Sequence, residues 1–247
     1  MQTPLVEFKN VTKRFGDKTI LDGVSFAVHE GETLCVIGGS GTGKSITLKL
    51  LLGLMPYDEG DIFYRGKALT QMREEELNQM RQRMGMLFQG GALFDSLNVF
   101  ENVAYPLEER GERDVDKIRD QVLEHLDWVG LKGSADLNPS DLSGGMVKRV
   151  GLARAIITEP ELILYDEPTA GLDPTNVNRI DELILDLKKR LKAASIVVTH
   201  HMESVFRIAD KVALLYHKKI AFYGTIQELK ASRNPVVQEF IEGRIGD

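Results

Sequence analysis

The run Gly38-Gly39-Ser40-Gly41-Thr42-Gly43-Lys44-Ser45 decides the fold of this chain. It matches the pattern of a glycine, four residues and Gly-Lys-Ser/Thr, in which backbone N–H groups close around phosphate oxygens. The apolar residues 33–37 precede it as a predicted buried strand, and residues 46–52 follow as a predicted helix. The helix N-terminus adds partial positive charge. We therefore predict a nucleotide-phosphate site in which Lys44 reaches the terminal phosphates and the Ser45 hydroxyl binds Mg²⁺.

The composition indicates a globular chain with a mildly acidic balance. Its 247 residues allow one large domain, or a core with subdomains, that needs no disulfide or structural metal to fold. The net charge of −6 disfavours a dedicated nucleic-acid binder, which usually has a basic face. A single cysteine, Cys35, fits a reducing compartment, and its apolar strand favours a small core residue over a redox sensor.

The sequence has neither the pattern of a signal peptide nor that of a membrane span. Residues 1–4 lack a basic segment followed by an apolar one. The nearest apolar stretch, residues 48–55, is interrupted by Lys49 and falls short of the ~18 residues that a span requires. We expect a soluble chain that meets a membrane only through a partner.

The part of the chain before Gly90 predicts strands around the phosphate loop. Residues 5–8 and 24–28 alternate in part between apolar and polar side chains, and turn residues separate them. Together with residues 62–64 they predict a small antiparallel sheet beside the nucleotide strand. The elements that follow are a charged helix over residues 73–83 and a strand over residues 84–88, which ends at Gln89.

Residues 90–160 favour helices and loops, and after them strands and helices alternate again. Apolar side chains recur at helical spacing from Val115 to Val129, with Asp114 as N-cap and Gly130 as stop. The later alternation predicts a mostly parallel sheet with helices on both faces and ligands at the carboxyl ends of its strands. Its elements are strands over residues 162–165 and 195–199, a helix over 177–191, a closing hairpin over 211–216 and 220–223, and a last helix that begins at the Thr225 capping box.

Two acidic side chains, Asp166 and Glu167, follow an apolar strand. Carboxylates at such a place are costly unless they have partners or a function. Beside a phosphate loop, Asp166 suits Mg²⁺ binding, directly or through water. Glu167 suits polarisation of the water that attacks the γ-phosphate. The simpler alternative is an acidic turn after a strand.

The segment Leu142-Ser143-Gly144-Gly145-Met146 resembles the signature of the ATP-binding cassette (ABC) ATPases, from which Met146 departs at the last position. The resemblance covers essentially the whole chain, with the motifs in the family's order. For Phe15, one of the residues to which this resemblance gives a role, the alternative is a buried position in the core. The roles implied are adenine stacking by Phe15, contact of Gln89 with Mg²⁺ and with a permease, a D-loop at Gly171-Leu172-Asp173, and contact of His200 with the γ-phosphate.

The same resemblance implies an α/β fold with a P-loop NTPase (RecA-like) core, a small antiparallel β subdomain and an inserted α-helical subdomain. The implied division is about residues 1–89 and 161–224 for the core and β subdomain, about 90–160 for the α-helical signature subdomain, and 225–247 for a C-terminal helical tail.

A second copy of the chain is the first partner that the resemblance implies. Ser143 and the amides of Gly144 and Gly145 would begin a helix whose positive end faces ATP on the opposite copy. Two copies would then hold two ATP molecules between them in a two-fold dimer. Asp173 would lie at the same interface, and the implied cofactors are ATP and Mg²⁺.

The residues that follow Gln89 discriminate among transporters. In ABC ATPases this segment lies against a coupling helix of the permease, and the apolar Leu93, Phe94, Leu97 and Phe100 would suit a groove for it. The alternative places some of these four in the core of the helical subdomain.

Residues 88–107, the run Met146-Val147-Lys148-Arg149 and the tail over residues 235–243 closely resemble the ATPases of maintenance-of-lipid-asymmetry (Mla) transporters. That resemblance implies transport of phospholipid or another lipid between bacterial membranes. The implied partners are an integral-membrane permease, an MCE-domain lipid-binding protein and a STAS-domain protein, with no nucleic acid. The implied location of this chain is peripheral, at the cytoplasmic face of the inner membrane.

Other functions compete with this interpretation. An ABC importer or exporter for another substrate would carry the same motifs. A non-transport ABC ATPase usually has a coiled-coil insertion or two fused cassettes, for which 247 residues leave no room. A nucleotide-binding regulator without turnover is disfavoured by Lys44, Asp166, Glu167 and His200. Among the remaining side chains, we expect a structural or solvated role for His201 and packing roles for His125 and Trp128.

Overall fold

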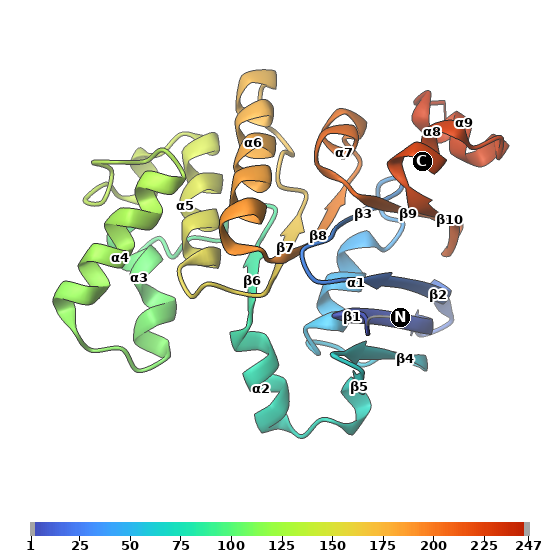
Figure 1. The fold of residues 1–247 in the computed structure, drawn as a ribbon, viewed down its shortest axis with the longest axis horizontal. Helices are drawn as coiled ribbons and strands as arrows, with labels where there is room; N and C mark the ends of the chain where they lie inside the picture. The colour runs from blue at the N-terminus through green and yellow to red at the C-terminus, as the bar shows by residue number, and fades with distance from the viewer. Residues whose placement is uncertain (1–2, 245–247) are drawn as a thin grey trace.

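The computed structural model describes residues 3–244, which form two β-sheets with helices between and around them (Figure 1). The strands of the larger sheet are β3 (Thr33–Ile37), β6 (Met84–Leu87), β7 (Leu162–Asp166), β8 (Ala194–Thr199), β9 (Lys211–Tyr216) and β10 (Lys219–Thr225). Their order is β10-β9-β3-β8-β7-β6. Neighbours from β9 to β6 pair in parallel, and β10 runs antiparallel to β9. The mostly parallel sheet predicted from the sequence is confirmed.

The smaller sheet is antiparallel, as predicted, and has the order β2-β1-β4-β5. Its two long strands extend well beyond the segments that the sequence pattern indicated. They form one hairpin whose register shifts between Phe8 and Arg14, so that the alternation of apolar and polar side chains breaks off there. The strands are β1 (Val6–Phe15), β2 (Lys18–Val28), β4 (Glu59–Tyr64) and β5 (Lys67–Ala68).

Side chains of the larger sheet alternate between two buried layers. On β3, Leu34 and Val36 belong to one cluster, and Cys35 and Ile37 belong to the other, as the two-residue period of a strand requires. The first cluster joins the sheet to α1 and the small sheet. Burial raises the pKa of the Cys35 thiol, so Cys35 is a small core residue, as the sequence predicts. Helix α1 extends over Lys44–Leu51.

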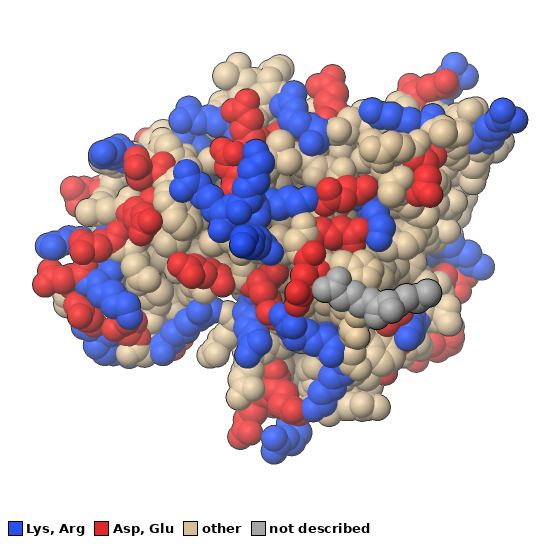
Figure 2. Space-filling view, viewed as in Figure 1, with Lys and Arg blue, Asp and Glu red and all other residues tan. Residues whose placement is uncertain are grey.

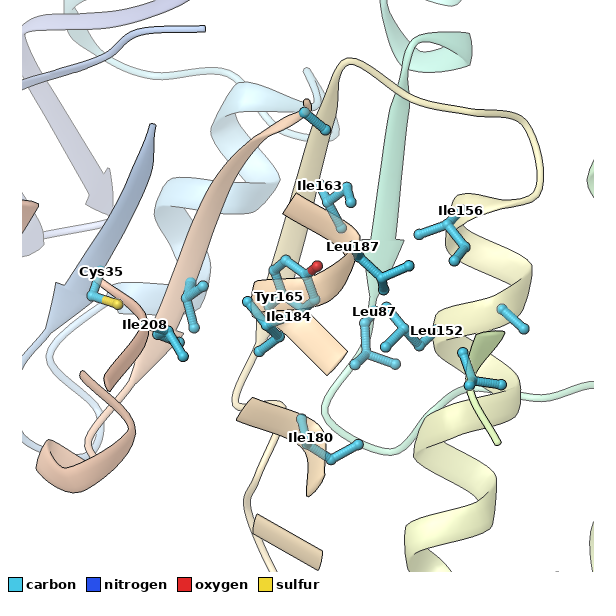
Figure 3. Packing of buried hydrophobic residues seen from close by; sticks show 14 of the residues in the cluster. Cys35, Leu87, Leu152, Ile156, Ile163, Tyr165, Ile180, Ile184, Leu187 and Ile208 are labelled. Atoms are coloured by element: carbon cyan, nitrogen blue, oxygen red, sulfur yellow. The ribbon is translucent and has the colours of Figure 1, made fainter. Parts of the chain in front are cut away.

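The second cluster lies under α6 (Pro174–Leu191) and α7 (Met202–Ile208), which cover the other side of the sheet in Figure 1. Figure 3 shows Ile184 and Leu187 of α6 beside Tyr165 of β7. Because this layer is continuous with the helices that follow Gln89, those helices are fixed relative to the carboxyl ends of the strands.

The helices of residues 90–160 pack on one another at one end of the molecule (Figure 1). Asp114 caps α4 through the N–H groups of Asp116 and Lys117, as predicted. Ser143 caps α5 by accepting a hydrogen bond from Met146 N at 3.3 Å. The subdomain boundaries themselves stay a prediction. The helices here are α3 (Val99–Glu109), α4 (Val115–Trp128) and α5 (Gly144–Ile156), and α2 (Glu74–Gln82) precedes them.

The C-terminal part corrects one prediction. Helix α8 (Ile226–Ala231) begins at the expected Thr225 capping box but is not the last helix. Asn234 caps a further helix, α9 (Pro235–Ile241), in which Pro235 takes the first position, where no backbone N–H is needed. Residues 245–247 of the predicted tail lie outside the described residues.

The surface mixes both signs of charge. In Figure 2 basic and acidic side chains are interspersed over the visible face, with a basic group over the carboxyl end of α6. The last turn of α6 carries Lys188, Lys189 and Arg190, whose charge suits the negative end of the helix dipole. Within residues 3–244, each helix is too short or too polar to cross a bilayer.

Candidate functional site

Four segments of the predicted site leave the carboxyl ends of parallel strands. The phosphate loop follows β3, Gln89 follows β6, Glu167 follows β7 and His200 follows β8. Because these strands run in parallel, their ends lie at one edge of the sheet. The sheet therefore brings together residues that are far apart in the chain, such as Gly38 and His200, which are 162 positions apart (200 − 38).

The phosphate loop needs its glycines at two positions. A Cβ on Gly38 would lie 2.5 Å from the Leu215 carbonyl oxygen, and a Cβ on Gly43 would lie 2.7 Å from Ile20 Cγ2. Gly43 is also the N-cap of α1 with a φ of 103°, in the region that favours glycine. The loop therefore lies too close to Leu215 and to Ile20 for a side chain at Gly38 or Gly43. As the N-cap, Gly43 also sets the direction in which α1 begins.

Lys44 and Ser45 connect this loop to the acidic end of β7. Lys44 Nζ donates to the carbonyl oxygens of Gly38 (2.9 Å) and Gly39 (2.8 Å) and lies 3.7 Å from Glu167 Oε1. Ser45 Oγ donates to Asp166 Oδ1 at 2.6 Å. Lys44, Asp166 and Glu167 are buried, so their charges interact more strongly than at the surface.

Glu167 has an unusual backbone conformation. Its φ of 47° lies in the left-handed region, which costs a residue with a side chain on the order of 1–2 kcal/mol. Its N–H donates to Val198 O at 2.8 Å, and its Oε1 lies 3.0 Å from His200 Nδ1. Such a conformation persists where neighbouring contacts fix it, and it is common at functional sites.

A cavity of about 330 Å³ joins these residues. It is lined by Ser40, Gly41, Gly43, Lys44, Ser45, Ile46, Gln89, Glu167 and His200. Gly38, Gly39, Thr42 and Asp166 are beside it in the chain, and Thr42 Oγ1 donates to Gly39 O at 2.9 Å. The structure therefore gathers the predicted phosphate, metal and catalytic residues around one cavity.

The predicted signature and D-loop residues form a second group. The residues described as lining the cavity do not include Ser143, Gly144, Gly145 or Asp173. A Cβ on Gly145 would lie 2.7 Å from the side chain of Asn176, whose N–H groups bind the Asp173 carboxylate. These hydrogen bonds lower the pKa of Asp173. One chain thus presents the start of α5 and the start of α6 together, apart from its own phosphate loop.

Phe15 is exposed, which excludes the core alternative for it. Half of its surface is accessible, and Lys13 Nζ lies 4.9 Å from its ring centroid. Lys13 is itself buried and pairs with Asp58 Oδ2 at 3.7 Å. An aromatic ring with one face near a cation and much of its surface in solvent is suited to stacking, so adenine stacking stays the prediction for Phe15.

A second, larger cavity of about 630 Å³ lies between the end of β6 and the helices α2, α3 and α5. Its lining includes Phe88, Phe94 and Tyr105, all of them large exposed aromatic side chains. Of the four apolar residues proposed for a partner groove, Phe94 lines this cavity, whereas Leu93 and Phe100 pack against the core. The core alternative therefore holds for these two.

Two histidines, His201 and His125, have the structural roles expected of them. His201 is the N-cap of α7, where its Nδ1 lies 3.0 Å from Ser204 Oγ, which is a structural role. His125 is buried, and its ring lies 4.2 Å from that of Trp128, as expected for packing. Burial lowers the pKa of His125.

Lys148 contacts the candidate site, which the sequence pattern did not predict. It is a buried lysine of α5 that donates to the carbonyl oxygens of Gln89 and Glu167. Burial lowers the pKa of its ammonium group, whereas Asp166 and Glu167 raise it. Lys148 is one of three cations on α5, with Arg149 and Arg154, so the sequence alone did not single it out or show what it touches.

Residues 21–170 match the protein family described as ABC transporter. The chain is 41% identical over 98% of its length to the intermembrane phospholipid transport system ATP-binding protein MlaF of Haemophilus influenzae, covering 92% of that protein. It is 43% identical to TRIGALACTOSYLDIACYLGLYCEROL 3, chloroplastic, of Arabidopsis thaliana, over 98% of this chain and 74% of that one. It is 39% identical to a probable ribonucleotide transport ATP-binding protein, mkl, of Mycobacterium leprae, over 97% of this chain and 69% of that one.

Solved structures share the fold. A dimeric ATP-binding cassette in a post-hydrolysis state with ADP and Pi superposes with a TM-score of 0.81 at 30% identity, over 90% of this chain and 98% of that chain. The structure of cbiO1 from Clostridium perfringens, part of the cbiONQ ABC transporter complex, superposes with a TM-score of 0.84 at 26% identity, over 96% of this chain and 94% of that chain. The expected cassette fold is thereby confirmed.

Proposed function

The chain belongs to the ABC transporter family and is an ATPase, and we propose that it powers phospholipid transport between two bacterial membranes through a permease. The observation that carries the proposal is the cavity at the carboxyl edge of the sheet, where a phosphate loop, a glutamine, a carboxylate pair and a histidine from four strand ends converge. The likeness to MlaF over nearly the whole of both chains supports the choice of substrate.

The residues around Ser45 fit a hard divalent cation. Ser45 Oγ lies 2.6 Å from Asp166 Oδ1, and Gln89 lines the same cavity. Hydroxyl, carboxylate and amide oxygens are ligands that Mg²⁺ accepts. In this proposal Ser45 and Gln89 hold the ion, and Asp166 holds it directly or through water. Bound Mg²⁺ would neutralise charge on the phosphate oxygens.

The remaining groups each have one role in the proposed binding and hydrolysis of ATP. The amides of residues 38–45 bind phosphate oxygens, and Lys44 adds a positive charge at the terminal phosphates. The Glu167 carboxylate accepts a proton from the attacking water. In this proposal His200 contacts the γ-phosphate, and the 3.0 Å distance between its Nδ1 and Glu167 Oε1 supports a role beside the base. Phe15 stacks on adenine.

A second copy of the chain would complete the site. Ser143 and the amides of Gly144 and Gly145 stand at the amino end of α5, a helix of 13 residues, and Asp173 lies next to them through Asn176. A partner's γ-phosphate at this end would meet backbone donors and the positive end of the helix dipole. The dimeric cassettes among the structural relatives support this arrangement.

The larger cavity would receive the permease. Its aromatic lining of Phe88, Phe94 and Tyr105 suits the apolar face of a short helix. Its lining residues Phe88 and Ala92 flank Gln89 in the chain, which connects the cavity to the nucleotide site. In this proposal the chain is peripheral, on the cytoplasmic face of the inner membrane. An MCE-domain protein and a STAS-domain protein would complete the complex.

Reconstitution tests the proposal. The chain, co-expressed with its permease and MCE-domain protein, is placed in vesicles that carry a fluorescent phospholipid, and ATP-dependent transfer of the lipid to the MCE-domain protein or from it is followed. We expect transfer that requires ATP, Mg²⁺ and Lys44. Because one set of relatives is named for ribonucleotide transport, radiolabelled ribonucleotides serve as the competing substrate. Uptake of ribonucleotides without lipid transfer would contradict the proposed substrate.

A further inference from the structure

Lys148 is a buried cation to which the sequence analysis assigned no role in the site. It lies on α5, five residues after Ser143, and only 5% of its surface is accessible. An ammonium group at such a depth is costly unless acceptors replace its water. Its acceptors are therefore informative about why the position holds a lysine.

Both acceptors are backbone carbonyls of predicted catalytic residues. Lys148 Nζ donates to Gln89 O and, at 3.3 Å, to Glu167 O. Gln89 follows β6 and Glu167 follows β7, so one side chain joins the ends of two strands to the helix that begins at Ser143.

The contact with Glu167 falls on a strained residue. The left-handed φ of 47° at Glu167 needs contacts that hold it. The N–H of Glu167 donates to Val198 O at 2.8 Å, and its carbonyl accepts from Ala170 N at 3.2 Å and from Lys148. Because the backbone conformation sets the direction of the side chain, Lys148 contributes to the position of the carboxylate beside His200.

The contact with Gln89 falls on a loop that is already close to α5. A Cβ on Gly91 would lie 2.7 Å from Val147 Cγ1, and a Cβ on Gly151 would lie 3.0 Å from Gly91 O. The loop and the helix therefore fit each other without space for a shift, and Lys148 anchors the end of the loop that carries Gln89.

We propose that Lys148 is a positioning residue of the ATPase, which fixes the backbones of Gln89 and Glu167 relative to the signature helix. The inference rests on the proposed function of these two residues. It differs from the role of Ser143, since Lys148 acts on the nucleotide site of its own chain, whereas Ser143 faces the nucleotide of the second copy. A displaced carboxylate or amide affects the chemical step more than the binding of ATP.

The test compares Lys148→Met with Lys211→Met in the full chain. Lys211 is the control, because it is also a lysine held by an acceptor, Glu32 Oε1 at 2.8 Å, but it stands at the start of β9, away from the carboxyl ends of the strands and from the cavity. We expect Lys148→Met to lower kcat by about 100-fold, the loss that a displacement of 1 Å can cause, with KM changed little. Lys148→Arg, which keeps a positive charge and N–H donors in a larger group, should recover part of that loss.

Thermal unfolding of each variant separates positioning from folding. Lys211→Met loses the ion pair with Glu32 and should lower stability, while the folded protein keeps its kcat. Equal kcat values for folded Lys148→Met and wild type would overturn the inference, as would an equal fall of kcat in both variants or a fall in ATP affinity that matches the fall in kcat. The wild-type chain tests the proposed function separately, because an unmodified chain that does not hydrolyse ATP contradicts the proposed roles of Gln89 and Glu167 themselves.

Discussion

Replacement of Glu167 by glutamine removes the proposed base with little change of shape. The glutamine side chain has the same length and can keep a hydrogen bond to His200 Nδ1, 3.0 Å away in the native protein. Lys44 keeps its two hydrogen bonds to Gly38 O and Gly39 O, so the loss of the 3.7 Å contact with Glu167 leaves it with partners. The substitution therefore removes a proton acceptor and one negative charge, and preserves the packing.

The expected size of the effect follows from the role of the base. General-base catalysis contributes about 10² to 10⁴ in rate, which corresponds to roughly 3–5 kcal/mol of activation free energy. We expect kcat to fall by this factor while the affinity for ATP stays within about threefold. With chemistry blocked, the ATP-bound dimer should accumulate.

Phosphate release measures the rate, a fluorescent nucleotide measures binding, and size-exclusion chromatography with ATP measures the dimer. Glu159→Gln is the matched control, because Glu159 is also a glutamate with a left-handed φ, of 48°, but it is exposed and outside the cavity. A folded Glu167→Gln variant that turns over at the wild-type rate would refute the assignment of the base.

The remaining predictions concern the two ends of the site and the surface. Ser143→Ala removes the cap of α5 and should cost about 1 kcal/mol of stability in thermal unfolding. It should also reduce hydrolysis without reducing ATP binding by the monomer, and a matching loss of monomer binding would place Ser143 at its own nucleotide. Gly38→Ala forces a Cβ to within 2.5 Å of a backbone oxygen, so it should lower both the melting temperature and ATP affinity, whereas Gly90→Ala, whose Cβ meets no heavy atom of the described residues within 4 Å, should leave the melting temperature unchanged. Hydrogen bonds from Lys117 and the backbone lower the pKa of Glu112 from 4.5 to about 2, so its stabilisation is present above pH 4.5 and is lost as the pH falls toward 2. The stability difference between wild type and Glu112→Gln should therefore shrink over that range, and a difference independent of pH would contradict the shift.

The sequence predicts the parts of the fold that local patterns determine. The phosphate loop, the strand before Asp166 and the caps at Asp114 and Thr225 depend on a few adjacent residues, and they form as predicted. The long hairpin of β1 and β2 was underestimated, because its register shifts hide the alternation.

Local sequence patterns do not predict contacts between residues that are far apart in the chain. Lys148 lies 59 positions from Gln89 and 19 from Glu167, so only the fold shows that it touches both. The fold also shows that Ser143 and Asp173 lie together, and apart from the phosphate cavity, through the packing of Gly145 on Asn176. That separation within one chain is the physical basis for expecting a second copy.

In the proposed function two copies of the chain build each nucleotide site, and a cross-link between copies tests this arrangement. One preparation carries Ser40→Cys and the other Ser143→Cys, both with Glu167→Gln, while the native Cys35 is buried and out of reach. A short thiol cross-linker should join the two kinds of chain when ATP and Mg²⁺ are present, and should join neither kind to itself. Cross-links that form equally well without nucleotide, or only between identical variants, would show that the two copies do not share the nucleotide sites.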